Sequence, residues 1–330
     1  MSEPVLQVKG LKTYYYTEEG VVPAVDGLDF EVEPGETFAI VGESGCGKSV
    51  TSLSILRLIP SPPGKIIDGE IIYHGQDLVK KSEREMRSIR GNDISMIFQE
   101  PMTSLNPVFT VGQQIGESFR FHQQMGKAEM LKKSIEMLRL VGIPEPEHVI
   151  NDYPNQLSGG MRQRVMIAMA LAGHPRLLIA DEPTTALDTT TQKQILDLLR
   201  DLNSSEGMAV LFISHDLGVV TSICSRVHVM YLGQIVEEID ACGLMERPSH
   251  PYAQGLIASI PSLEGERVDT LADIPGTVPP LTAIPCGCRF APRCARADER
   301  CRAQEPPLVA VNACDRSKCW LVEKGECHGC

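Results

Sequence analysis

One segment of the sequence has the residue types and spacing of a loop that binds phosphate. Residues 42–49 read GESGCGKS and fit the pattern G-x-x-x-x-G-K-[ST]. Glycines let successive backbone N–H groups curl around a phosphate, Lys48 can reach the terminal phosphates, and Ser49 can bind Mg²⁺. An apolar strand precedes the loop and a helical stretch follows it, as this chemistry requires. The segment predicts a site for a nucleoside triphosphate.

A pair of carboxylates follows a second apolar strand. Residues 177–182 read LLIADE, so that Asp181 and Glu182 come directly after the strand. In a magnesium-assisted nucleotide hydrolase, Asp181 would hold Mg²⁺, directly or through water, and Glu182 would polarise the attacking water. Alone, the pattern is also typical of a strand that ends at a solvated turn. The phosphate loop gives it the catalytic interpretation.

Four further motifs lie in order along the same part of the chain. They are Gln99 after residues 96–98, LSGGMRQR at 157–164, ALD at 186–188 and ISHD at 213–216. With these motifs, about residues 5–240 resemble the ATPases of ABC transporters, in which they are the Q-loop, the signature, the D-loop and the switch histidine. Met161 in the signature and Cys46 in the phosphate loop depart from the usual Gln and Ser, and neither change removes a catalytic group.

The resemblance implies a role for each motif. It implies catalytic roles for Glu182, His215, Gln99 and Lys48, and magnesium ligation by Ser49, Gln99 and Asp181. The implied ATP-binding residues, with Tyr15 stacking on adenine, are Tyr15, Gly42, Glu43, Ser44, Gly45, Cys46, Gly47, Lys48, Ser49 and Val50. Since the family closes two such subunits head to tail, the residues that would face the partner's ATP are Ser158, Gly159, Gly160 and Asp188.

Three segments resemble a narrower group, the ATP-binding subunits of dipeptide and oligopeptide importers. They read QEPMTSLNP at 99–107, ADEPTTALD at 180–188 and HPYAQGL at 250–256. The resemblance implies two membrane-spanning permease subunits, which would dock near residues 100–124, and a second homologous ATPase subunit in a heterodimer. It also implies an extracytoplasmic substrate-binding protein as an indirect partner, no nucleic acid, and a peripheral position on the cytoplasmic face of the cell membrane.

Two alternatives stay open. Nickel importers belong to the same group, use the same chemistry and differ only in substrate. A soluble ABC ATPase with a redox-sensing iron–sulfur tail is an alternative of a different class. If it acted on DNA or ribosomes, we would expect a coiled-coil insertion, two ATPase domains in one chain or a basic surface, and the sequence indicates none of these.

The end of the chain is rich in cysteine. Of the 11 cysteines, eight lie in the last 45 residues, and in a reducing compartment such a cluster favours a metal or redox site over disulfides. Cys288, Cys294, Cys301 and Cys319 have the spacing of peptide-importer tails, some of which hold a [4Fe–4S] cluster. Four thiolates also suit tetrahedral zinc, which remains the alternative, as does a tail of unliganded thiols. The extra cysteines without an assigned role are Cys286, Cys314, Cys327 and Cys330.

Hydrophobic periodicity predicts the strands and helices that must position these residues. Alternating or apolar runs predict strands at 5–8, 28–32, 36–41, 177–180, 210–213 and 227–231. Helical spacing predicts helices at 48–59, 130–141, 160–172, 190–202 and 217–224. Strands that alternate with helices indicate a parallel sheet covered on both faces.

Composition bounds the remaining possibilities. The chain has 330 residues, 42% of them hydrophobic, and a formal net charge of −12, which argues against a dedicated nucleic-acid binder. Its apolar runs are too short to cross a bilayer, and no secretory signal is visible at the start, so we expect a soluble intracellular chain.

These observations predict an α/β fold. The expected architecture is a P-loop NTPase core of the ABC ATPase type, with an inserted α-helical subdomain and a small, loop-rich C-terminal cysteine domain. We expect the ATPase domain at residues 1–247, its helical subdomain at about 96–175, and the cysteine-bearing tail, where proline becomes frequent, at 248–330. The expected cofactors are ATP, Mg²⁺ and the [4Fe–4S] cluster.

Overall fold

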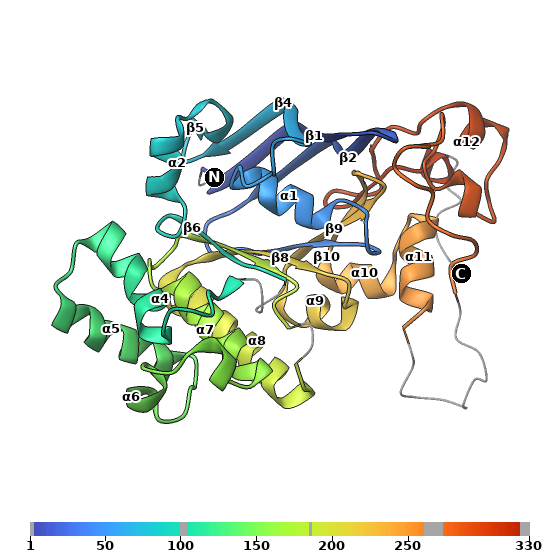
Figure 1. Cartoon of the computed structure of the whole chain (residues 1–330). Helices are drawn as coiled ribbons and strands as arrows, with labels where there is room; N and C mark the ends of the chain where they lie inside the picture. The colour runs from blue at the N-terminus through green and yellow to red at the C-terminus, as the bar shows by residue number, and fades with distance from the viewer. Residues whose placement is uncertain (1–2, 100–103, 185–186, 261–272, 324–330) are drawn as a thin grey trace. The chain divides into compact units, whose positions relative to one another are not determined.

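The computed structural model describes residues 3–99, 104–184, 187–260 and 273–323 (Figure 1). The chain forms two compact units. The first comprises residues 1–6, 32–37 and 73–213, and the second comprises residues 7–31, 38–72 and 214–330. No helix in the described ranges combines the length and the apolar composition that a membrane span requires.

The first unit is built on parallel strands. In order across the sheet they are β6 (Ile94–Ile97), β7 (Leu177–Asp181) and β8 (Ala209–Ser214), with a short β5 (Gln76–Asp77) elsewhere in the unit. Leu177 pairs with Ile94 on one side and with Ala209 on the other. Every residue of these three strands is buried, as expected when both faces of a parallel sheet are covered.

Helices make up most of the rest of this unit. They are η1 (Leu78–Lys80), α2 (Glu83–Ile89), α4 (Val111–Ser118), the π-helix η2 (Phe119–Gln123), α5 (Lys127–Leu140), α6 (Pro146–Val149), η3 (Pro154–Gln156), α7 (Gly159–Leu171) and α8 (Thr189–Glu206). Local chemistry fixes several ends: Thr110 and Gln113 form a capping box that starts α4, and Gly207 in the left-handed region ends α8.

The signature helix α7 lies at the centre of this helical group. It packs against α4, α5 and β6, and Figure 1 labels α7 beside the green helices α4 and α5. Val165, Ile167 and Ala168 are fully buried, so α7 is held by apolar contacts along its middle. Its first turn, which carries the signature glycines, is left accessible.

The second unit contains antiparallel as well as parallel pairing. Strands β2 (Gly20–Val32), β1 (Leu6–Thr17) and β4 (Gly64–Tyr73) are neighbours in one sheet. In the other, β3 (Thr37–Val41) pairs in parallel with β9 (Arg226–Tyr231), which continues antiparallel to β10 (Gln234–Asp240), β12 (Arg316–Ser317) and β11 (Val309–Ala310). The expected parallel pairing is therefore confirmed for β3–β9 and β6–β7–β8, and it is wrong beyond β9.

Short helices complete the second unit. They are α1 (Lys48–Ile55), α9 (Leu217–Ile223), α10 (Ala241–Glu246), α11 (Pro251–Ala258), η4 (Ala291–Arg293), α12 (Glu299–Ala303) and α13 (Trp320–Glu323). The helix expected at 48–59 is too long, because Arg57 adopts a left-handed φ of 51° and ends the helix at Ile55. A sequence pattern of apolar residues does not show this turn.

The start of α11 explains the segment HPYAQGL. Nδ1 of His250 accepts from the N–H of Tyr252 and caps the helix, and Pro251 occupies its first position. The backbone N–H groups of Ser249 and His250 donate to the carboxylate of Glu237 on β10, at 2.5 and 3.1 Å. Burial nevertheless raises the pKa of Glu237 to about 7. These bonds join α11 to the sheet.

Candidate functional site

The phosphate loop lies between β3 and α1. Gly47 has a φ of 109°, and a Cβ there would lie 2.1 Å from the carbonyl oxygen of Ala24. A Cβ on Gly42 would lie 2.2 Å from the carbonyl oxygen of Met230. Both positions therefore require glycine, because the loop passes too close to neighbouring backbone for any side chain.

Lys48 lies against its own loop. Its Nζ donates to the carbonyl oxygens of Gly42, at 2.7 Å, and Glu43, at 3.0 Å, and the residue is 5% exposed. Cys46 is buried beside it, and burial raises the pKa of this thiol. Ser44 and Gly45 are exposed, while Ser49 and Val50 are half-buried at the start of α1.

The three tyrosines of β1 have different surroundings. The hydroxyl of Tyr14 donates to Asp26 Oδ1 at 2.6 Å, Tyr15 is half-buried, and Tyr16 is exposed. Thr13, next in the strand, shares a hydrogen bond of 2.8 Å with Ser54 of α1. The strand that carries Tyr15 is therefore tied to the helix that begins in the phosphate loop.

The acidic motif and the Q-loop glutamine meet in the first unit. Asp181 ends β7 and is 2% exposed. Nε2 of Gln99 donates to Glu182 Oε2 at 3.1 Å. Glu182 adopts a left-handed φ of 48°, and its N–H donates to the carbonyl oxygen of Ile213 at 2.8 Å. A glutamate held in this unfavourable conformation is typical of a functional position.

The signature and D-loop are also close to each other within the first unit. Ser158 is the N-cap of α7, and its Oγ accepts from the N–H of Met161 at 3.3 Å. A Cβ on Gly160 would lie 3.8 Å from Thr191 and 4.0 Å from Leu187. Asp188 caps α8, and hydrogen bonds from the backbone and hydroxyl of Thr191 lower its pKa. Ala186 of the D-loop lies outside the described residues.

The structure divides the predicted ATP-site residues between the two units. Gln99, Asp181, Glu182, Ser158 and Asp188 belong to the first. The second holds the phosphate loop, Tyr15 and the exposed His215, which directly follows β8.

Sequence reasoning missed one residue of the signature helix. Gln163 of α7 is 1% exposed, and its Nε2 donates to the carbonyl oxygen of Pro183, directly after the acidic pair. It links the signature helix to the segment that carries Glu182. The only sequence signal was its place in LSGGMRQR, which says nothing about its partner.

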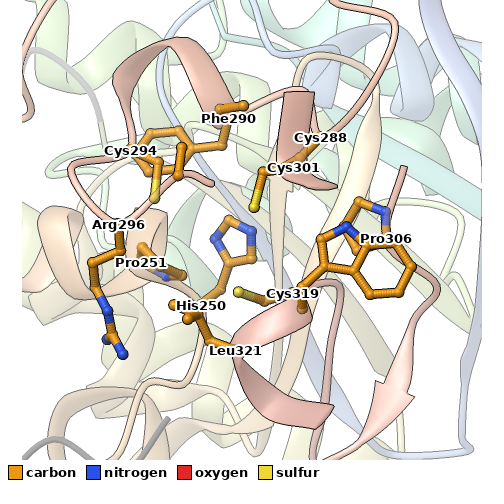
Figure 2. Close-up of a pocket in the computed structure, with 13 residues that line it drawn as sticks. His250, Pro251, Cys288, Phe290, Cys294, Arg296, Cys301, Pro306, Cys319 and Leu321 are labelled. Atoms are coloured by element: carbon orange, nitrogen blue, oxygen red, sulfur yellow. The ribbon is translucent and has the colours of Figure 1, made fainter. Parts of the chain in front are cut away.

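The four candidate cluster cysteines line one pocket of the second unit. Cys288, Cys294, Cys301 and Cys319 surround it, together with His250 and Trp320. Figure 2 shows the sulfur atoms of Cys294, Cys301 and Cys319 pointing into the same space around the His250 ring. Burial raises the pKa of Cys288 to about 11 and also raises that of Cys294 and Cys301.

No single metal ion fits the described cysteines as they stand. Within residues 3–99, 104–184, 187–260 and 273–323, no three Cys, His, Asp or Glu side chains are grouped so that they could hold one ion. Cys286 and Cys314 are exposed and do not line the pocket. The predicted second pair, Cys327 and Cys330, lies outside the described residues.

Comparison with known proteins gives matches over nearly the whole chain. The family model "ABC transporter" matches residues 25–185, and "Oligopeptide/dipeptide transporter, C-terminal region" matches residues 236–301. A probable peptide ABC transporter ATP-binding protein, y4tR of Sinorhizobium fredii, is 53% identical and covers 96% of this chain and 94% of its own. The oligopeptide transport ATP-binding protein AppD of Bacillus subtilis is 50% identical, with 97% of each chain covered.

A solved structure agrees with these matches. The ATP-binding cassette MJ0796, in a dimeric post-hydrolysis state bound to ADP and phosphate, has a TM-score of 0.65 and 30% identity. The match covers 72% of this chain and 98% of the cassette. The cassette fold therefore accounts for most of the chain, and the oligopeptide-type C-terminal region accounts for part of the rest.

Proposed function

The chain belongs to the ABC transporter family, and we propose that it is the ATP-hydrolysing subunit of a dipeptide or oligopeptide importer. The observation that carries the substrate class is the match of residues 236–301 to the C-terminal region of oligopeptide and dipeptide transporters. Relatives named as peptide transport subunits are about 50% identical over both the cassette and this region.

The phosphate loop would hold the triphosphate of ATP. Backbone N–H groups of the loop and the dipole of α1 would bind the phosphate oxygens, and Lys48 would exchange its loop carbonyls for the terminal phosphates. Tyr15 would stack on adenine. Ser49, Asp181 and Gln99 offer the oxygen ligands that Mg²⁺ prefers, and the ion would neutralise charge on the transferred phosphoryl group.

Glu182 would act on the attacking water. Its position after β7, its left-handed backbone and its bond to Gln99 support a role as the base that orients and polarises this water. His215, exposed after β8, would bind the terminal phosphate. Catalysis is then mostly positioning and charge neutralisation.

Two ATPase subunits would act together. Ser158 and Gly159 are exposed at the start of α7, and Asp188 is exposed at the start of α8, so both helix starts are accessible to a second subunit. Helix N-termini attract phosphate, which suits a contact with the partner's ATP. The MJ0796 cassette is dimeric with bound ADP and phosphate, which supports the same arrangement here. The second subunit would be a homologous ATPase.

A permease would dock near residues 104–124. Val108 is 70% exposed, Phe109 47% and Phe121 63%, so three large apolar side chains are open to solvent within this short stretch. Residues 100–103 of the expected docking segment lie outside the described residues. Docking there would place the chain on the cytoplasmic face of the membrane as a peripheral subunit, with the substrate-binding protein as an indirect partner.

The cysteine pocket would hold a [4Fe–4S] cluster. Four cysteines line one space, and each iron of such a cluster needs one protein thiolate; the same four thiolates would also suit a tetrahedral zinc ion, which is the alternative. Bound iron would supply the positive charge that keeps the buried thiols ionised, and its ligation by Cys288, Cys294, Cys301 and Cys319 would supply folding energy to the tail. Iron and sulfide analysis of protein isolated without oxygen tests this, and a colourless zinc protein would contradict it.

The test of the proposed activity is ATP hydrolysis by the purified chain. We expect turnover that requires Mg²⁺ and that is lost in a Lys48→Ala variant, because the terminal phosphates then lose their cation. Wild-type protein that neither binds nor hydrolyses ATP would refute the proposed function. The proposed boundary at residues 247–248 can be tested with a chain truncated there.

A further inference from the structure

The segment between two pocket cysteines also reaches the phosphate loop. Residues 288–294 read CRFAPRC, so two arginines lie between Cys288 and Cys294. Phe290 and Ala291 line the cysteine pocket, while the side chains of Arg289 and Arg293 bind groups on the strands and loop of the nucleotide site. All these residues belong to the second unit.

Arg293 binds Glu43, the second residue of the phosphate loop, through two hydrogen bonds. Its Nη1 donates to Oε2 at 2.6 Å, and its Nη2 donates to Oε1 at 3.1 Å. Two further N–H groups of Arg293 bind backbone: Nε donates to the carbonyl oxygen of Pro275 at 3.1 Å, and Nη2 donates to that of Ile274 at 3.3 Å. The Arg293 side chain is only 4% exposed, while the Glu43 side chain is 29% exposed, so the guanidinium is buried and the carboxylate is partly open to solvent.

Two further contacts link the same region to the loop. The hydroxyl of Tyr252, a fully buried residue of α11, accepts from the N–H of Glu43 at 2.8 Å. Tyr252 packs against Phe290, with ring centroids 5.4 Å apart. Phe290 is a wall of the cysteine pocket, so the backbone and the side chain of Glu43 are both held by residues that adjoin that pocket.

Arg289 makes a parallel set of contacts. Its guanidinium donates to Asp26, which also accepts from the hydroxyl of Tyr14, the neighbour of Tyr15. Burial would raise the pKa of Asp26, but these two hydrogen bonds outweigh burial and lower it. Arg289 also donates to the carbonyl oxygen of Leu232, and the N–H of Gly233 donates to the carbonyl oxygen of Cys46 at 2.8 Å.

The charge of Glu43 makes the contact with Arg293 necessary. The loop has to receive a polyanion, and a free carboxylate on its second residue would repel the phosphates. Arg293 offsets the charge of that carboxylate, and its two parallel hydrogen bonds fix the direction of the Glu43 side chain.

We propose that Arg293 is a positioning residue for nucleotide binding, through which the cysteine-bearing segment sets the geometry and charge of the phosphate loop. The proposal rests on the proposed ATPase function. Coupling of this kind is reciprocal, so that ATP bound at the loop also orders the segment between the cysteines.

Rescue by a second substitution tests this proposal. We expect Arg293→Gln to weaken ATP affinity about tenfold, because Glu43 then faces the phosphates unpaired. The double variant Arg293→Gln with Glu43→Gln should recover most of the affinity that Arg293→Gln loses, because no carboxylate is then left unpaired in the loop. The ATP affinity of Arg293→Lys should lie between those of wild type and Arg293→Gln, since an ammonium group keeps the positive charge but cannot form the two parallel hydrogen bonds of a guanidinium. Arg302→Gln, an exposed arginine of α12, is the matched control and should bind ATP normally.

Hydrogen exchange gives a second readout that does not depend on turnover. In wild type, ATP should slow the exchange of backbone amides in residues 285–302, and this protection should be lost in Arg293→Gln. Normal ATP affinity in a folded Arg293→Gln variant, or a double variant as weak as the single one, would overturn the proposal. In that case, wild-type protein that still binds ATP would leave the proposed function intact.

Discussion

At the scale of single residues, Glu182 is the proposed catalytic base. Its left-handed backbone and its hydrogen bond from Gln99 hold a carboxylate at the end of β7, where Asp181 is buried beside it. Glutamine has the same shape but cannot accept a proton. We therefore expect Glu182→Gln to bind ATP with near-normal affinity and to lose about 10²- to 10⁴-fold in turnover, measured by ATPase assay and by nucleotide titration.

A matched variant controls for the loss of one negative charge. Asp201→Asn removes an exposed carboxylate from α8 of the same unit and should leave turnover within about twofold of wild type. Equal turnover in Glu182→Gln and wild type would remove Glu182 from its proposed role.

Site residues could be predicted from the sequence where the chemistry requires a fixed local spacing. Gly42, Gly47 and Lys48 follow a pattern, and the structure shows why glycine is needed at the first two. The partner of Glu43 could not be predicted, because Arg293 lies 250 residues away and no local pattern marks it. Long-range ion pairs depend on how elements pack, and a single sequence does not show that.

At the scale of elements, a residue at a helix start can stabilise the helix as its cap, and it can also bind a ligand; the two roles can be separated by experiment. Ser158 caps α7, and Thr110 caps α4 in the same unit with a comparable bond. Replacing either by Ala should lower the free energy of unfolding by about 1 kcal/mol. Only Ser158→Ala should also lower ATPase activity, since only Ser158 would meet the partner's ATP. Denaturant unfolding and turnover measured on both variants separate the roles, and equal turnover losses would contradict the assignment.

The sheet of the second unit buries a neutral histidine. His228 of β9 packs edge-on against Phe38, and in the described part of the chain neither of its ring nitrogens has a hydrogen-bond partner. Burial, together with the charges of Arg226 and Arg316, lowers its pKa to about 3. The free energy of unfolding is therefore unaffected by His228 above about pH 6.5. It decreases as the pH falls towards 3, because the unfolded chain binds a proton at this histidine before the folded chain does.

A substitution at this position should change the pH dependence of stability. Between about pH 6.5 and 4, wild type takes up one proton at His228 when it unfolds, and His228→Phe does not. We therefore expect the free energy of unfolding of the variant to depend less steeply on pH, by the contribution of one proton. The variant should be more stable than wild type at pH 5 by about 1 kcal/mol or more, and the difference should shrink at pH 7.5. Urea unfolding at both pH values measures this, and an unchanged slope would show that His228 is not the titrating group. His250, whose pKa burial also lowers to about 3, remains in both proteins.

Periodicity found helices α1, α5, α7, α8 and α9 and the central strands, and it missed other elements for physical reasons. Strands β7, β8 and β9 are apolar runs of ordinary length, and the sequence shows them directly. Strand β10 was missed because Glu237 lies in its middle, and that carboxylate accepts hydrogen bonds from the backbone at the start of α11. Strand β4 was missed because Asp68 and Gly69 interrupt its two Ile pairs.

At the scale of the whole molecule, the exposed apolar stretch at residues 108–121 should be an interface with a permease. We expect Val108→Asp combined with Phe109→Asp to weaken co-purification with the permease at least about tenfold, since a charge would be buried on assembly. ATP affinity of the isolated chain should not change. Val21→Asp, which alters an equally apolar and 48% exposed residue of β2, is the control. Normal assembly of the double variant would place the interface elsewhere.

The cassette architecture could be predicted because its motifs occur in a fixed order along the chain. For the tail, the sequence predicted only which cysteines come together. Four cysteines do line one pocket, as their spacing suggested. Their contacts through Phe290 and Tyr252 towards the phosphate loop depend on aromatic packing that no spacing encodes.

Peptide uptake tests the central claim most directly. Cells whose own copy of this chain is replaced by wild type, Glu182→Gln or Asp201→Asn can be compared for uptake of a radiolabelled dipeptide, a radiolabelled oligopeptide and nickel. We expect Glu182→Gln to abolish uptake of at least one of the peptides, Asp201→Asn to leave peptide uptake intact, and nickel uptake to be unchanged in both variants. Normal uptake of both peptides with Glu182→Gln, or a loss confined to nickel, would contradict the central claim.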